Sequence, residues 1–177
     1  MSFIFRKATL DDIGQLNSLI EISSKSINSS FYTKKQIEAA LKSAWTVDPQ
    51  LIIDNTFWVA QTIKDEIVGC GGWSKHRTLF GKTNTKEGLK KLNPIKDAAK
   101  IRAIFVHPDY TRQGIGSALM DRCENEAKDF GFDTLELVST LSGEKLYTAR
   151  GYTTIKKYNA DLVGGITNEV ILMSKKI

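Results

Sequence analysis

Two glycines, Gly114 and Gly116, stand where an apolar, β-branched segment gives way to a helix-like repeat. The backbone N–H groups in the first turn of a helix have no internal partners, and the helix dipole adds partial positive charge there. Because glycine has no Cβ atom, a ligand can approach these N–H groups closely. Arg112 adds a permanent positive charge two residues earlier. The spacing predicts an anion site, and the anion we expect is a pyrophosphate.

Two other nucleotide-binding motifs do not fit this chain. A dinucleotide-binding fingerprint would need a third glycine at position 119, where Leu119 stands. A P-loop would need a glycine five residues before Gly81, and that position is His76.

The elements that must position the glycines follow from the apolar periodicity. A β-branched run ends at Pro108, and helical spacing follows from Ile115 to a glycine cap at Gly131. Possible capping boxes at Thr9 and Thr33 predict two earlier helices. A run of glycines within residues 69–72 is unusual for a strand and predicts a bend or a close backbone approach. The expected strands are 3–8, 56–62, 67–74, 99–106, 133–138, 152–158 and 168–174, and the later helices are 113–130 and 142–149.

Two motifs in series carry a resemblance to a known family. The segments Val106-His107-Pro108 and Gly114-Ile115-Gly116, followed by Tyr147-x-x-x-Gly151-Tyr152, resemble the acetyl-CoA-binding core of the GNAT acetyltransferase superfamily. The resemblance extends over roughly the whole chain. One position departs from it, because the leading Gln or Arg of the family motif is Thr111 here and the arginine comes one residue later. The resemblance therefore leaves open whether Arg112 or Gln113 supports the phosphates.

The resemblance implies one domain over residues 1–177 with an α/β (α+β) fold. We expect a mixed, mostly antiparallel central sheet with a splayed strand pair, flanked by helices. It also implies acetyl-CoA as co-substrate, no metal, and a small-molecule or peptide amine as acceptor. The residues that it assigns to acetyl-CoA binding are Ile104, Phe105, Val106, Arg112, Gln113, Gly114, Ile115, Gly116 and Ser117.

Tyr147 occupies the family's position for the general acid that protonates the CoA thiolate. The alternative is a structural tyrosine that packs the last helix, which is the role expected for Tyr152. No general base is identified, because the strand before the motif carries no acid. Glu136 on the adjacent strand and His76 are the nearest candidates, but we expect His76 to be a solvated loop residue.

The basic residues are unevenly distributed. The chain has a net charge of +5, and residues 75–102 contain nine Lys and Arg against two acids. Residues 75–97 are longer than an ordinary connection and are expected to form a mobile cover over the acceptor side. A nucleic-acid-binding module is a further alternative, disfavoured because this segment has few aromatic residues and no binding motif.

Composition limits the class of protein further. The 177 residues are 41% hydrophobic, and no apolar stretch is long enough to span a bilayer. Cys70 and Cys123 are expected to be buried reduced thiols in a cytoplasmic protein. We also expect a monomer or homodimer and no membrane partner. An N-acetyltransferase and a non-catalytic CoA- or acyl-CoA-binding sensor on the same fold both remain open.

Overall fold

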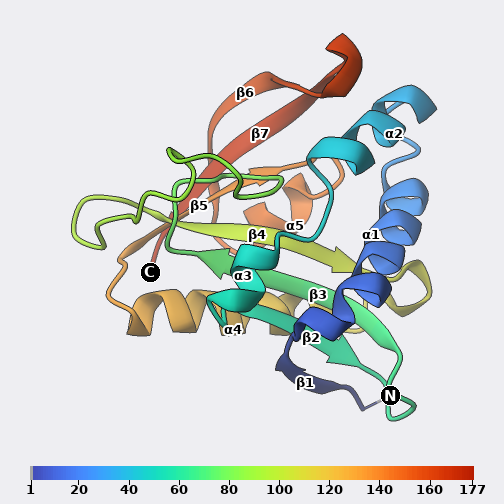
Figure 1. The fold of residues 1–177 in the computed structure, drawn as a ribbon, viewed down its shortest axis with the longest axis horizontal. Helices are drawn as coiled ribbons and strands as arrows, with labels where there is room; N and C mark the ends of the chain where they lie inside the picture. The colour runs from blue at the N-terminus through green and yellow to red at the C-terminus, as the bar shows by residue number, and fades with distance from the viewer. Residues whose placement is uncertain (1) are drawn as a thin grey trace.

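A seven-stranded sheet runs through the molecule in the order β1-β2-β3-β4-β5-β7-β6, and helices cover both of its faces (Figure 1). The computed structural model describes residues 2–177. Neighbouring strands are antiparallel except β4 and β5, which are parallel. The strands are β1 (Ile4–Lys7), β2 (Phe57–Gln61), β3 (Ile67–Ser74), β4 (Ala99–Val106), β5 (Thr134–Ser139), β6 (Thr153–Asp161) and β7 (Thr167–Lys176).

The helices divide between the two faces of the sheet. Leu16, Leu19 and Ile20 of α1 belong to a core on one face, whereas Met120 and Cys123 of α4 belong to a core on the other. No helix within residues 2–177 is long and apolar enough to cross a membrane. The helices are α1 (Ile13–Ile27), α2 (Lys34–Ser43), α3 (Pro49–Ile53), α4 (Ile115–Asp129) and α5 (Glu144–Ala149), and the short 3-10 helices are η1 (Leu10–Asp12), η2 (Pro108–Tyr110) and η3 (Val163–Gly165).

The glycines of β3 allow neighbouring elements to approach the strand closely. A Cβ atom at Gly69 would lie 2.6 Å from Cγ2 of Ile115, so the glycine lets the start of α4 rest on the sheet. A Cβ atom at Gly71 would collide with the side chain of Ile104. The close approach predicted from the glycine run is confirmed at both glycines.

Strands β4 and β5 separate soon after they meet. They pair only at Ala99 with Leu135 and at Lys100 with Glu136. Farther along β4, Ala103 has a φ of +53°, and the pairing with β3 shifts register opposite it. Such a bulge bends a strand and turns it away from its neighbour. The mostly antiparallel sheet with a splayed strand pair is therefore confirmed.

Candidate active site

The gap between the splayed strands is part of a cavity of about 850 Å³. Residues 101–106 of β4 line one wall, and Leu137 and Val138 of β5 line another. Nine of the ten residues expected at the site line this cavity, and Gln113 does not. The side-chain amide of Gln113 instead donates to the carbonyl oxygen of Asp109 at 3.4 Å. Arg112 is thus the residue that the structure brings to the cavity.

The N-terminus of α4 opens into the cavity at its glycines. Gly114 has a φ of +83°, Arg112 has a φ of +60°, and the first helical hydrogen bond is from Ala118 N to Gly114 O at 2.9 Å. Alternating positive and negative φ values form the concave backbone turns that bind anions. A Cβ atom at Gly116 would come no closer than 3.8 Å to any neighbouring protein atom, so the fold itself has room for one there. A glycine at 116 therefore leaves open space beside the first turn of the helix.

Tyr147 lies on α5 and lines the same cavity. Its ring packs edge-on against Tyr152, with 5.9 Å between the ring centroids. Gly143 lies beneath the ring, since a Cβ atom there would be 3.0 Å from Cε2 of Tyr147. Burial, with a smaller contribution from Cys123, raises the pKa of Tyr147 above that of an ordinary phenol. The side chain is consequently protonated at neutral pH.

A polar cluster under α5 holds Tyr147 in place relative to α4. Glu124 of α4 accepts a hydrogen bond from the hydroxyl of Tyr152 at 3.2 Å and forms ion pairs with Arg150 and Lys175. Arg150 also pairs with Asp121 at 2.6 Å. Tyr152 is 2% exposed, which matches the core role expected for it. The cluster joins the end of α5 to the middle of α4. The two helices, which both contribute residues to the cavity lining, are thereby fixed to one another.

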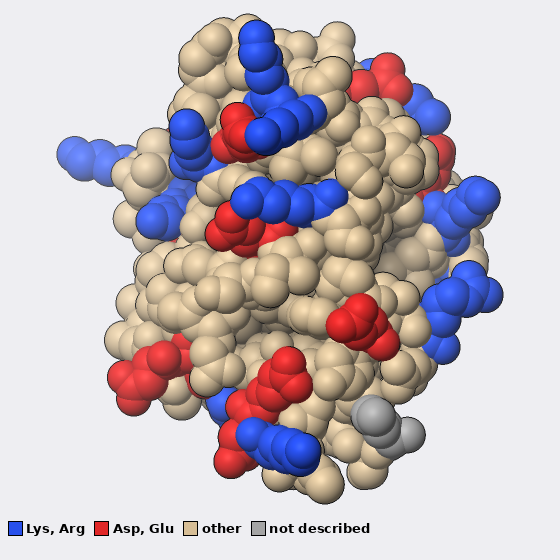
Figure 2. All heavy atoms as spheres, turned by 90° about the vertical axis from the view of Figure 1, so that its right-hand side faces the viewer, with Lys and Arg blue, Asp and Glu red and all other residues tan. Residues whose placement is uncertain are grey.

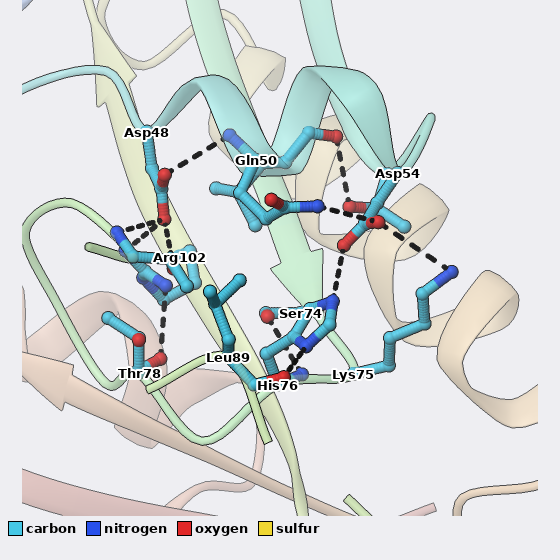
Figure 3. A network of polar contacts seen from close by, with 12 residues as sticks. Asp48, Gln50, Asp54, Ser74, Lys75, His76, Thr78, Leu89 and Arg102 are labelled. Atoms are coloured by element: carbon cyan, nitrogen blue, oxygen red, sulfur yellow. Dashed lines mark hydrogen bonds and ion pairs between the residues drawn. The ribbon is translucent and has the colours of Figure 1, made fainter. Parts of the chain in front are cut away.

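Neither candidate for the general base lines the cavity. The carboxylate of Glu136 accepts from Lys100 Nζ at 2.5 Å. The expectation that His76 is solvated is wrong, because it is buried with its ring nitrogens 2.9 Å from Asp54 Oδ2 and 2.8 Å from the carbonyl oxygen of Leu89 (Figure 3). Sequence reasoning placed His76 in solvent because its segment is polar, and a partner just after α3, Asp54, is not visible in that pattern.

A buried arginine shapes the cavity wall opposite β5. The guanidinium group of Arg102 donates to the carbonyl oxygens of Thr78 and Gly81 and to Asp48 Oδ2 (Figure 3). Asp48 also caps α3 and accepts from the hydroxyl of Thr83 at 2.6 Å. These bonds hold residues 78–83 against the sheet. The sequence analysis counted Arg102 only among the basic residues of 75–102, although a charged residue inside an apolar strand is a signal for a buried partner.

We use the term acceptor half for the part of the cavity beyond the residues assigned to acetyl-CoA. Four segments that are far apart in the sequence form it: the end of α1, the segment after α2, residues 79–81, and the β6–β7 hairpin. Within residues 2–177 no group of three or more His, Cys, Asp or Glu is placed to hold a metal ion. The apolar side chains of the acceptor half include Ile27, Trp45, Leu79, Phe80, Leu162 and Val170.

Sequence comparison identifies the family. The profile of the acetyltransferase (GNAT) domain matches residues 54–154, which is more than half of the chain and includes β4, the start of α4, and Tyr147. The protein belongs to the GNAT acetyltransferase family. No curated protein sequence matches the chain significantly.

Solved structures share the fold at low sequence identity. A GCN5-related N-acetyltransferase from Rhodopseudomonas palustris is 19% identical with a TM-score of 0.75, over 100% of this chain and 97% of that one. The PaiA N-acetyltransferase from Thermoplasma acidophilum, solved in complex with coenzyme A, is 18% identical with a TM-score of 0.69, over 100% of both chains. The acetyltransferase yncA from Salmonella typhimurium, solved with acetyl-CoA, is 14% identical with a TM-score of 0.62, over 99% of this chain and 94% of that one.

Proposed function

We propose that the protein transfers an acetyl group from acetyl-CoA to an amine by direct attack. The observation that carries this proposal is the position of the glycine-rich start of α4 at the mouth of the gap between β4 and β5. Two similar structures were solved with CoA or acetyl-CoA, which supports the same ligand here. Acetyl-CoA would supply an activated thioester, and the protein would supply binding, orientation and a proton.

The residues of the cavity divide this work. The N–H groups of Ile115, Gly116 and Ser117 would bind the pyrophosphate, with Arg112 as a nearby cation. Residues 104–106 would bind the pantetheine arm, because β5 leaves the backbone of β4 without a strand partner there. This arrangement would direct the thioester toward Tyr147, which lines the same cavity.

Direct attack fits the chain better than an acyl-cysteine intermediate. Cys70 and Cys123 are both fully buried, and neither lines the cavity. Burial raises the pKa of Cys70 to about 12 and also raises the pKa of Cys123. Because the thiolate is the nucleophilic form, neither cysteine is suited to accept an acetyl group.

Tyr147 would donate a proton to the leaving thiolate. Its raised pKa keeps the phenol protonated, which preserves the proton to be given. The same desolvation disfavours the CoA thiolate and raises the pKa of its conjugate thiol. The free-energy cost of moving the proton from Tyr147 to the thiolate therefore does not grow in step with the pKa of Tyr147. We assign no side chain as the general base.

The experiment is a titration of CoA into the protein and its Gly116→Val variant by calorimetry. The protein itself has room for the first carbon of the new side chain, so the valine should obstruct the ligand rather than the fold. Affinity for CoA should fall at least tenfold. Thiol release in the presence of amines then separates an enzyme from a non-catalytic CoA sensor.

Gly14→Val is the matched control for this titration. Gly14 is also the second residue of its helix, and nothing lies within 4 Å of a Cβ atom built there. It should retain the parent affinity while bearing the same cost of a β-branched residue in a helix. Equal affinity in folded Gly116→Val and Gly14→Val proteins would place the anion site elsewhere.

A further inference from the structure

The side chains of the acceptor half include no acid or imidazole that could form an ion pair with an ammonium group or deprotonate it. Across residues 2–177, the side chains that line the whole cavity include no Asp, Glu, His or Cys. Its charged residues are Arg102, Arg112 and Lys145, and all three are positive. An amine that entered as a cation would lose its hydration and meet no opposite charge in exchange.

Four titratable groups outside the cavity are paired with other side chains. Glu136 is paired with Lys100, and His76 is paired with Asp54. Glu21 and Glu38 face a separate small groove beside α1 and α2. Each has a lysine partner on its own helix. Figure 2 shows the side of the molecule at right in Figure 1, where acidic side chains are interspersed with basic ones at the surface rather than gathered in one patch.

The tyrosines of the cavity do not replace a base. Tyr110 and Tyr147 both line it, and burial raises the pKa of each above that of an ordinary phenol. The hydroxyl of Tyr110 also donates to Glu66 at 3.3 Å. Both phenols therefore carry their protons at neutral pH. Neither can take a proton from the amine, as a general base must.

The apolar and aromatic part of the acceptor half suits a flat apolar molecule, and the polar side chains beside it are uncharged. Trp45 and Phe80 contribute aromatic rings, and Leu162 and Val170 contribute aliphatic groups from the β6–β7 hairpin. Trp45 is held by an edge-on contact with the buried ring of Tyr32, at 5.9 Å between centroids. Aromatic rings prefer such edge-on or offset arrangements with other rings.

Building on the proposed acetyl transfer, we propose that the acceptor is an amine of the arylamine type. Its amino group is uncharged at neutral pH, and its body is apolar and carries no positive charge. The proton balance of the reaction leads to the same class. A neutral amine attacks the thioester carbon, the C–N bond forms, and the C–S bond breaks with its electron pair left on sulfur. The nitrogen then loses one proton and the sulfur gains one, so no additional base is consumed.

An alkylammonium acceptor would need one step more. It carries an extra proton that must leave before the nitrogen has a free electron pair for attack. An alkylamine with a pKa near that of lysine, about 10.4, is neutral in only about one molecule in two thousand at pH 7. The cavity contains no side chain to take this proton, so it would have to pass to solvent before binding.

The test compares isomeric amines that differ in basicity. Two matched pairs are 4-methylaniline with benzylamine, and 4-butylaniline with 4-phenylbutylamine. The full-length protein is assayed with acetyl-CoA at pH 7, and acetylated product is measured by mass spectrometry. The kcat/KM value should be at least tenfold higher for the arylamine of each pair, and the polyamine spermidine should not be acetylated.

The pH dependence supplies a second readout. The kcat/KM value for an arylamine should be flat between pH 6 and pH 9, whereas that for an alkylamine should rise about tenfold per pH unit as its neutral fraction grows. Preference for benzylamine or spermidine at pH 7 would overturn the acceptor class. So would a protein that binds CoA but acetylates neither arylamine. Failure of the protein to bind CoA at all would instead contradict the proposed acetyl transfer.

A pair of variants tests the missing carboxylate directly. Leu162 is half-buried in the wall of the acceptor half, and Leu162→Glu would place a carboxylate there. It should raise the kcat/KM ratio of benzylamine to 4-methylaniline at least tenfold over the parent value. Leu162→Gln, of the same shape without the charge, should leave that ratio near the parent value. An equal change of the ratio in both variants would contradict the proposal.

Discussion

Tyr147 and Tyr152 are neighbouring tyrosines with different partners. The hydroxyl of Tyr152 donates to Glu124, which is itself held by Arg150 and Lys175. Tyr147 packs its ring against Tyr152 and lines the cavity. The two residues therefore allow a structural effect and a catalytic effect to be measured separately.

Tyr147→Phe keeps the ring and removes the only proton that the side chain can donate. General acid catalysis contributes about 10²–10⁴-fold to many reactions, so kcat should fall at least about tenfold. Affinity for CoA and melting temperature should stay near the parent values. Tyr152→Phe should do the reverse, lowering the melting temperature because Glu124 loses a hydrogen-bond donor, with kcat little changed.

Steady-state kinetics and thermal melts on the two variants check this prediction. Parent-rate turnover by a folded Tyr147→Phe enzyme, when chemistry limits the rate, would leave Tyr147 with a structural role only.

The raised pKa of Tyr147 also predicts the alkaline behaviour of the enzyme. An ordinary tyrosine loses its proton near pH 10, and burial moves this event to higher pH. With a fully neutral acceptor, kcat should therefore not decline between pH 7 and about pH 10 through loss of the proton on Tyr147. A pH–rate profile with an arylamine measures this. A decline centred near pH 8 that disappears in Tyr147→Phe would contradict the assigned direction of the shift.

At the scale of elements, the connection from β3 to β4 is more firmly anchored than its polar sequence indicates. Arg102 and Asp48 hold residues 78–83, and His76 joins the connection to Asp54 (Figure 3). The cavity-lining residues 79–81 lie within the anchored part. Whether the whole of residues 75–97 is a mobile cover that acetyl-CoA orders stays a prediction.

Arg102→Met should destabilise the protein strongly. It leaves Asp48 buried without its cation and frees two loop carbonyl oxygens, and removing one partner of a buried pair costs about 3–5 kcal/mol. Denaturant unfolding measures the change in the free energy of unfolding. Arg77→Met is the control, because Arg77 pairs with Glu87 at the exposed surface and such pairs contribute about 1 kcal/mol or less. Equal losses in the two variants would mean that the buried network does not stabilise the loop.

Local patterns in the sequence predicted most of these elements. Strands β3 and β4 occupy exactly the predicted residues 67–74 and 99–106, since long apolar runs bounded by turns define strands well. The five-residue helix α3 was not predicted, because Pro49–Ile53 is too short to show a helical period. His76 was misplaced for another reason, because it is buried by Asp54, which is distant in the sequence and leaves no mark on the spacing of nearby residues. The position of Arg102 inside an apolar strand signals a buried partner, but the sequence does not identify that partner as Asp48.

At the scale of the whole molecule, bound CoA should stabilise the fold. A ligand at one hundred times its Kd adds about 2.7 kcal/mol to the free energy of unfolding. For a chain of this size that corresponds to a rise in melting temperature of roughly 5–10 °C. Thermal melts with and without CoA measure the rise. The Gly116→Val protein should show little of it at the same CoA concentration, and an equal rise would indicate binding at another site.

The splay of β4 from β5 gives the sheet an edge in its interior. Past Lys100, β4 has no strand partner on its β5 side within residues 2–177. An exposed edge of this kind on the outside of a protein is a template for pairing with other chains, and it promotes aggregation. Here the unpaired part of β4 lines the cavity, so its free backbone groups face the proposed ligand site. The gap thus turns an edge that would otherwise attract another strand into a surface for an extended ligand.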